Sequence, residues 1–341
     1  MQFQFIHSAF KLPFLLTRVL RNINLQRNYI KEKVMPVLDK ALSVNDGSIA
    51  EREIKKISGY YALAVPAILG EGYCALRGFS MTEKERWAST CQGAMSALFD
   101  DFFDKDKLDE EAIERKIAGI SQTLAKRASE ELFDIFYSGA LQSVQGSWPM
   151  KHTLMNVHHA QVESKEQTTA ISKERILYIT LNKGGVSAQF YRTAFNHPYV
   201  TGEDELLYLQ GGLLQLANDI FDVYKDREAK INTIVTTADH IKDVRDLFTR
   251  HLTVFYDKAK LLPYPRRNIR RFLDLLSIGV FSRCLVCLDH LEKNEATSGN
   301  RFQVNKYSRE QLICDMDTRR NMLRSAAYLV KCKISNVKYK R

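Results

Sequence analysis

The chain has few of the residues that interrupt helices. Its 341 residues include only 7 prolines and 16 glycines, which is few for a β-rich or loop-rich protein. Apolar residues recur instead at spacings of three and four, the period of an amphipathic helix. Strand-like alternation is absent apart from a weak instance at residues 232–237. The sequence therefore predicts an all-α fold.

Long uncharged apolar runs and a secretion signal are also missing. Residues 1–20 are apolar, but they lack a cationic segment followed by a small-residue cleavage site. The run at 273–288 is interrupted by Asp274 and Arg283, so no stretch of about eighteen apolar residues is available to span a bilayer. We therefore expect a cytoplasmic protein with no transmembrane segment.

Cysteine is sparse, with six residues scattered over the chain. Cys284 and Cys287 form a CxxC pair inside an apolar helical stretch, but no second pair completes a zinc site. Scattered cysteines in a long chain without a secretion signal indicate reduced thiols. We interpret the CxxC pair as buried structural residues.

The charge is unbalanced, with a net value of +10. Such a balance fits a nucleic acid, an anionic membrane surface or a small polyanionic substrate. The cations are spread along the chain, with some concentration at residues 331–341, and no zinc-finger or aromatic-plus-basic RNA-binding pattern accompanies them. We therefore expect no nucleic-acid partner.

No internal repeat and no long Pro/Gly/Ser linker divides the chain. We expect a catalytic domain over residues 1–310 and a C-terminal helix with a basic tail over 311–341. Many helices with short connections suit a single large antiparallel bundle with a central apolar cavity. The spacing predicts helical segments at residues 12–43, 51–69, 82–103 (with N-capping residues at 80–83), 109–125, 128–143, 162–180, 186–195, 202–224, 238–258, 266–293 and 309–331.

The first of two acidic clusters ends an apolar helical segment, at Asp100, Asp101 and Asp104. Carboxylates three and four residues apart share one face of a helix, where their like charges repel unless something neutralises them. An oxygen-only cluster suits Mg²⁺, which binds through one or two carboxylates, waters and substrate phosphates. The alternative is a charged helix end that continues into the exposed run at 104–111.

The second cluster repeats oxygen ligands every four residues along one helical stripe, at Asn218, Asp222 and Asp226. Asp219 lies on the flank of this stripe. Lys225 and Arg227 bring positive charge to the same end, where a phosphate can be received. If the two acidic helices face each other, the clusters form opposing walls of a metal site that holds a diphosphate.

A glycine pair, Gly184-Gly185, lies between Lys183 and Arg192. Paired glycines break or bend a helix and let a ligand approach backbone amides. Lys183 and Arg192 are therefore candidate phosphate partners. The alternative is a turn between two helices with cations on its surface.

These motifs resemble those of the isoprenoid-synthase superfamily, which includes class I terpene synthases and prenyl diphosphate synthases. Asp100-Asp101-Phe-Phe-Asp104 resembles its DDxxD motif. Residues 218–226 resemble the second metal motif of terpene cyclases, Asn/Asp-Asp-x-x-Ser/Thr-x-x-x-Glu, with Asp at the Ser/Thr and Glu positions. Residues 218–222 also resemble the second DDxxD of chain-elongating synthases, with Asn218 in place of the first Asp. Residues 182–192 are similar to a lysine-containing segment that contacts diphosphate in prenyl synthases.

The resemblance implies a magnesium-dependent site with three Mg²⁺ ions, or Mn²⁺ in their place. The implied catalytic residues are Asp100, Asp101, Asp104, Asn218, Asp222 and Asp226. The implied metal ligands are the same six residues together with Asp219. The implied diphosphate contacts are Arg175, Lys183, Arg192, Lys225 and Arg227, with Arg175 and Lys183 as equal candidates for the sensor. Aromatic and small residues are expected to line the cavity, namely Phe99, Phe103, Gly184, Phe190 and Phe221.

The flanking residues bear on which reaction the resemblance implies. Chain-elongating synthases usually carry a double arginine after DDxxD and a Gly-Gly-Lys-Arg segment before it. Here Asp104 is followed by Lys-Asp-Lys-Leu, and no glycine pair precedes Lys55-Lys56, so a pocket for a second diphosphate is not visible. Head-to-head condensation, as in squalene or phytoene synthases, also needs two diphosphates.

The resemblance therefore favours a terpene cyclase, a lyase that ionises a linear prenyl diphosphate and cyclises the resulting allylic cation. The expected substrate is a C15 to C25 prenyl diphosphate, and homodimers are common among the proteins that the chain resembles. Two alternatives remain open. One is a chain-elongating or head-to-head prenyltransferase, and the other is a non-catalytic helical scaffold or binding protein.

Overall fold

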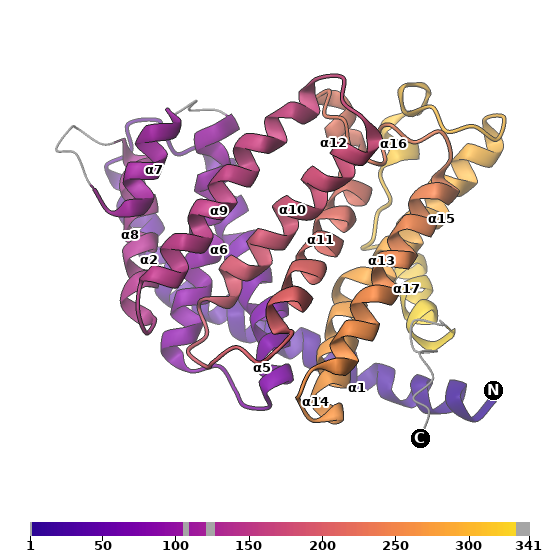
Figure 1. Cartoon of the computed structure of the whole chain (residues 1–341), viewed down its shortest axis with the longest axis horizontal. Coiled ribbons are helices and arrows are strands. Elements are labelled where there is room, and N and C mark those ends of the chain that lie inside the picture. The colour runs from indigo at the N-terminus through magenta and orange to yellow at the C-terminus, as the bar shows by residue number, and fades with distance from the viewer. Residues whose placement is uncertain (1, 105–108, 121–126, 332–341) are drawn as a thin grey trace. The chain divides into compact units, whose positions relative to one another are not determined.

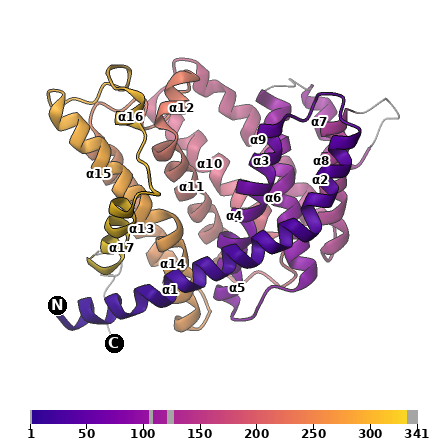
Figure 2. The same ribbon diagram turned by 180° about the vertical axis from the view of Figure 1, so that it is seen from behind.

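Every regular element in the described part of the chain is a helix, and no strand occurs there. The computed structural model describes the chain except for residues 1, 105–108, 121–126 and 332–341, and it describes no side chains for residues 2–11, 101, 103, 104, 330 and 331. Figures 1 and 2 show the helices from opposite sides. The predicted all-α fold is confirmed.

The chain forms two compact units that are discontinuous in sequence. Unit 1 comprises residues 1–17, 160–188 and 199–341, and unit 2 comprises residues 18–159 and 189–198. Helices α1 (Gln2–Tyr29), α9 (Trp148–Ser164) and α10 (Lys173–Arg192) each run from one unit into the other. Residue 310, the predicted domain boundary, lies inside unit 1.

Unit 2 is built around α6 (Glu83–Asp104), which packs along α8 (Ala128–Ser143). Aromatic rings fill this contact: Phe133 lies 6.0 Å from Phe99 and 5.4 Å from Phe102 between ring centroids. The other elements are α2 (Met35–Ser43), α3 (Glu51–Lys56), α4 (Ala62–Ala64), α5 (Glu71–Arg77), α7 (Glu110–Ala118) and the π-helical turns Ile30–Val34, Ile57–Tyr61 and Val65–Gly70.

Unit 1 packs α11 (Glu203–Phe221) against α13 (Ile241–Leu261) and α15 (Ser282–Thr297). The ring of Phe255 lies 6.0 Å from that of Phe272 and 5.8 Å from that of Phe281 in its core. The remaining elements are α12 (Val223–Glu228), α14 (Arg266–Leu276), α16 (Arg309–Leu312), α17 (Arg319–Lys331), the π-helical turn Ser277–Phe281 and the short 3₁₀ helices Lys165–Thr168 and Val304–Lys306.

Several predicted helices are confirmed. Residues 128–143 match α8, and α6 begins where capping residues were expected. The hydroxyl of Thr82 accepts a bond from the N–H of Glu85, whose carboxylate accepts one from the N–H of Thr82, so the two residues form a capping box. The weak strand-like alternation at residues 232–237 does not correspond to a strand, because the hydroxyls of Thr233 and Thr236 hydrogen bond each other's backbone N–H and hold a turn.

The expected break at Gly184-Gly185 is also wrong, because α10 is continuous from Lys173 to Arg192. These glycines serve helix packing instead. A Cβ on Gly184 would lie 2.1 Å from the carbonyl oxygen of Gly211 in α11, and one on Gly185 would lie 2.4 Å from the ring of Tyr208. The two backbones approach so closely that neither glycine has room for a side chain.

No helix among the described residues is long and apolar enough to cross a membrane. The cysteines that the structure describes, Cys74, Cys91, Cys284, Cys287 and Cys314, are all free thiols. Cys284 and Cys287 are buried, as the sequence predicts for the CxxC pair.

Candidate metal and diphosphate site

The second acidic cluster lies in unit 1, where α11 leads into α12. The helix is interrupted at Asp222, whose backbone has φ −94° and ψ 11°. Backbone hydrogen bonds of 2.8 Å still run from Asp222 N–H to the Asn218 carbonyl and from Asp226 N–H to the Asp222 carbonyl. Four oxygen-bearing residues of the prediction, Asn218, Asp219, Asp222 and Asp226, therefore lie within nine residues of chain.

Asp219 is more deeply placed than its flanking position in the sequence pattern suggested, with 4% of its surface exposed. Its carboxylate accepts hydrogen bonds from Thr180 Oγ1 of α10 at 3.1 Å and from Gln215 Nε2 at 3.0 Å. Burial raises the pKa of Asp219 to about 6, although these two bonds lower it in part. The carboxylate is thus oriented by α10 and by its own helix.

Asp226 is also buried, with 9% exposed. Its side chain makes no hydrogen bond to any residue that the structure describes, and burial together with the charges of Asp219 and Asp222 raises its pKa to about 7. Asp222 is half-buried and pairs with Lys225 at 3.2 Å, while Asn218 is exposed. The inner part of the cluster is therefore Asp219 and Asp226, rather than the straight stripe that the sequence predicted.

The cations predicted to bind the diphosphate differ in exposure and in the groups with which they interact. Lys183 of α10 acts electrostatically on both Asp219 and Asp226. Lys225 is exposed. Arg227 donates to the carbonyl of Tyr307 at 2.6 Å, and Arg175 pairs with Glu163 and Glu166 at 2.8 and 2.7 Å. Lys183 is thus the predicted phosphate partner whose charge reaches both buried carboxylates.

The first acidic cluster belongs to unit 2, at the end of α6. The Asp100 carboxylate accepts a hydrogen bond from Tyr61 Oη at 2.9 Å and lies 3.6 Å from Lys56 Nζ. The charge of Asp100, followed by burial, raises the pKa of Tyr61 well above its usual value, so the phenol stays a donor. Asp101, Phe103 and Asp104 lie in α6, but their side chains are outside the described residues.

The expected cavity residues fall in different surroundings. Phe99 and Phe190 are buried in the apolar core of unit 2, and Phe99 contacts Phe133 and His158. Phe221 is half-buried at the end of α11. Gly184 forms the close contact with Gly211.

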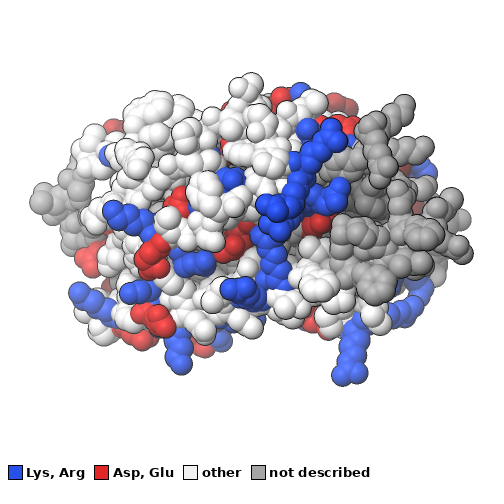
Figure 3. Space-filling view, turned by 90° about the horizontal axis from the view of Figure 1, so that it is seen from below, with Lys and Arg blue, Asp and Glu red and all other residues white. Residues whose placement is uncertain are grey.

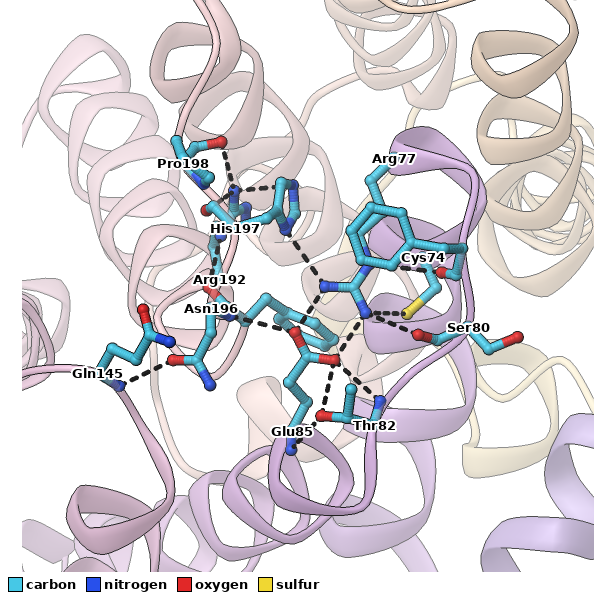
Figure 4. A network of polar contacts seen from close by, with 12 residues as sticks. Cys74, Arg77, Ser80, Thr82, Glu85, Gln145, Arg192, Asn196, His197 and Pro198 are labelled. Carbon is cyan, nitrogen blue, oxygen red and sulfur yellow. Dashed lines mark hydrogen bonds and ion pairs between the residues drawn. The ribbon is translucent and has the colours of Figure 1, made fainter.

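Arg192 lies in a buried polar network of unit 2 (Figure 4). Its guanidinium donates to the carbonyls of Phe195 and His197 at 3.0 and 3.1 Å, and its side chain has no exposed surface. The ring of His197 lies between Arg192 and Arg77, at 3.0 and 3.3 Å. These bonds give Arg192 a structural role in holding the turn that follows α10.

Positive charge is prominent on the face seen in Figure 3, the side on which α14 lies in Figure 1. The apolar residues of α14 are buried, and its exposed surface consists largely of Arg266, Arg267, Arg270 and Arg271. In both ribbon views α14 and α12 lie at opposite ends of unit 1. The basic face of α14 is therefore separate from the acidic cluster.

Among the residues that the structure describes, no three His, Cys, Asp or Glu side chains gather into a group able to hold a metal ion. Several neighbours of the acidic residues were not predicted as site residues, namely Thr180, Gln215, Tyr61 and Lys56. Thr180 and Lys183 are three residues apart, so the helical spacing of α10 could have indicated that they share a face.

No family model, curated protein or solved structure matches this chain.

Proposed function

We propose that the chain is a magnesium-dependent class I terpene synthase that ionises a linear prenyl diphosphate and cyclises the allylic cation in an apolar cavity of an antiparallel helical bundle. The observation that carries the proposal is the pair of buried carboxylates, Asp219 and Asp226, beside Lys183. The motif resemblance supplies the reaction class.

Two buried carboxylates of unit 1, Asp219 and Asp226, suit a divalent cation, although the described residues hold no ready group of three acidic, histidine or cysteine ligands. Asp226 is a buried carboxylate with no hydrogen bond to a described residue, and the charges of Asp219 and Asp222 add to its need for a counter-ion. Mg²⁺ characteristically binds through one or two carboxylates and completes its shell with waters and substrate phosphates. The proposal assigns metal binding in unit 1 to Asp219, Asp222 and Asp226 with Asn218, and in unit 2 to Asp100, Asp101 and Asp104.

Cations held by these carboxylates would supply positive charge to the departing diphosphate. In the chain itself, Thr180 and Gln215 fix the orientation of Asp219, and Lys183 is assigned to a diphosphate oxygen. Arg175 is a weaker candidate, because Glu163 and Glu166 already engage its guanidinium. Tyr61 and Lys56 both engage Oδ2 of the Asp100 carboxylate.

The test is turnover by the purified chain with C15, C20 and C25 prenyl diphosphates, with and without Mg²⁺, measured as diphosphate release and product formation. Mg²⁺-dependent release from a single substrate is expected. Product formed only when isopentenyl diphosphate is added would replace cyclisation by chain elongation. Failure of every substrate, together with no Mg²⁺-dependent binding of inorganic diphosphate, would leave the scaffold alternative and overturn the proposal.

Variants separate the site from the rest of the fold. Asp226→Asn and Lys183→Ala should each lower kcat/KM by at least about 100-fold, the scale of losing one charge-stabilising group. Asp243→Asn, an exposed carboxylate in the first turn of α13, is the matched control and should be unchanged. Arg175→Ala should lose less activity than Lys183→Ala. Full activity in both Asp226→Asn and Lys183→Ala would refute the site.

A further inference from the structure

The basic face of α14 gathers four arginines on one side of a short helix. The exposed residues of this helix are Arg266, Arg267, Arg270 and Arg271. Residues at this spacing lie on the same side of a helix, and the span from the first to the last rises by about 8 Å. The four guanidinium groups therefore form a compact block of positive charge on the side of unit 1 seen in Figure 3.

The acidic residues around this face leave most of its charge without a counter-ion. Asp274, the one carboxylate of α14, is half-buried and lies four positions after Arg270. At the end of α13, Asp257 pairs with Lys260 at 2.8 Å. The other three arginines of α14 make no ion pair with a carboxylate among the residues that the structure describes. Their charge is therefore available to a partner outside the chain.

This arrangement of charge opposes the stability of the helix that carries it. The macrodipole favours acidic residues in the first turn of a helix, but α14 has none there and carries Arg266 and Arg267 instead. The four arginines also form two pairs of like charges at a spacing of four, and the members of such a pair repel each other. An anionic surface placed against α14 would offset both effects.

The segment that leads into α14 adds apolar surface beside the arginines. Leu261, the last residue of α13, has 78% of its surface exposed, and Pro263 and Pro265 are exposed as well. The segment is fixed to unit 1 by Tyr264, whose Oη donates to Glu203 at 2.9 Å. Binding to a membrane interface draws on both kinds of surface, apolar area and attraction to anionic lipids. A surface for single-stranded nucleic acid would instead present aromatic rings on which bases stack, and α14 exposes none.

We propose that Leu261 and the basic face of α14 dock the protein on a membrane that is rich in anionic phospholipids. The guanidinium groups contact lipid phosphates, for which their paired N–H donors are suited, and Leu261 enters the headgroup layer. Each cation beside an anionic membrane strengthens binding about fivefold. Because this face is separate from the acidic cluster, docking is a property additional to the proposed reaction and independent of it.

The test is co-sedimentation of the full chain with vesicles of phosphatidylcholine alone and of phosphatidylcholine with one-third phosphatidylglycerol. The wild type should bind only the anionic vesicles, and more weakly as salt rises from about 0.05 to about 0.5 M, since salt screens exposed charges. Arg267→Gln/Arg271→Gln should bind about 25-fold more weakly, because it removes two cations at about fivefold each. Lys293→Gln/Lys306→Gln removes the same charge at exposed positions outside α14 and should bind within about twofold of the wild type.

Leu261→Gln should also bind the anionic vesicles more weakly than the wild type, and unchanged binding by this variant would contradict the proposal. Failure of the wild type to bind anionic vesicles at low salt would overturn it, as would equal losses in the arginine and lysine double variants. Binding of a single-stranded RNA that Arg267→Gln/Arg271→Gln weakens, without any binding to vesicles, would replace the lipid by a nucleic acid and overturn it too.

Discussion

Replacing Glu85 by Gln removes the only carboxylate that Arg77 is seen to pair with in the described residues. The two side chains have 4% and 1% of their surface exposed, and two hydrogen bonds of 2.6 Å join Arg77 to the carboxylate. The backbone N–H groups of Thr82 and Asn196 donate to it as well. Removing one partner of a buried pair costs about 3–5 kcal/mol, because the other charge stays buried.

The pKa of Glu85 gives an independent measure of how much its contacts stabilise the folded state. Burial raises this pKa, but the bonds from Arg77, Thr82 and Asn196 outweigh burial and lower it from 4.5 to about 2. A difference of this size corresponds to roughly 3 kcal/mol of folding stability. Because the pKa is lower in the folded state, the stabilisation is fully present above pH about 4.5 and is lost as the pH falls towards about 2.

Urea unfolding followed by far-UV circular dichroism measures the effect at neutral and acid pH. Glu85→Gln should be less stable than the wild type by about 3 kcal/mol at pH 7, and the gap should narrow as the pH falls below 4.5. Glu51→Gln, at an exposed pair with Lys55, is the control and should change stability by less than about 1 kcal/mol. A gap below about 1 kcal/mol at pH 7, or one that does not change with pH, would refute the reasoning.

Three further changes test unit 1. Gly184→Ala should cost about 1–3 kcal/mol in urea unfolding, since its Cβ would overlap the Gly211 carbonyl, whereas Gly59→Ala has open space and should be neutral. Asp226→Asn should stabilise the protein by about 1–3 kcal/mol in EDTA at pH 8, because it removes a buried, repelled charge, and a loss of stability would contradict this. Arg227→Met should release the Tyr307 carbonyl and speed amide exchange in residues 304–309, while Lys225→Met, at an exposed position, should not.

The sequence predicts the helices better than it predicts the site. Apolar periodicity and capping residues locate α6 and α8, because both signals are local. Residues 162–180 were expected to form one helix, but α9 ends at Ser164 and α10 begins at Lys173. The intervening residues contain no proline or glycine from which the interruption of the helix could have been predicted.

The acidic cluster shows why the site is harder to predict. The prediction that Asn218, Asp222 and Asp226 form one stripe depends on a straight helix. The helix is interrupted at Asp222, so the three side chains do not follow a straight line. Asp219 is buried, and its carboxylate accepts a hydrogen bond from Thr180, 39 positions earlier in the chain. Contacts between distant segments of this kind leave no periodic trace in the sequence.

The contact between Gly184 and Gly211 places a constraint on how this sequence can change. A Cβ on either residue would lie 2.1 or 2.0 Å from the other's carbonyl oxygen, so no single substitution at either position is accommodated in place. Moving the two helices apart would also pull Thr180 away from Asp219. Any descendant of this chain that retains the acidic cluster is therefore expected to keep both glycines. The two positions, 27 residues apart in the sequence, are then conserved together.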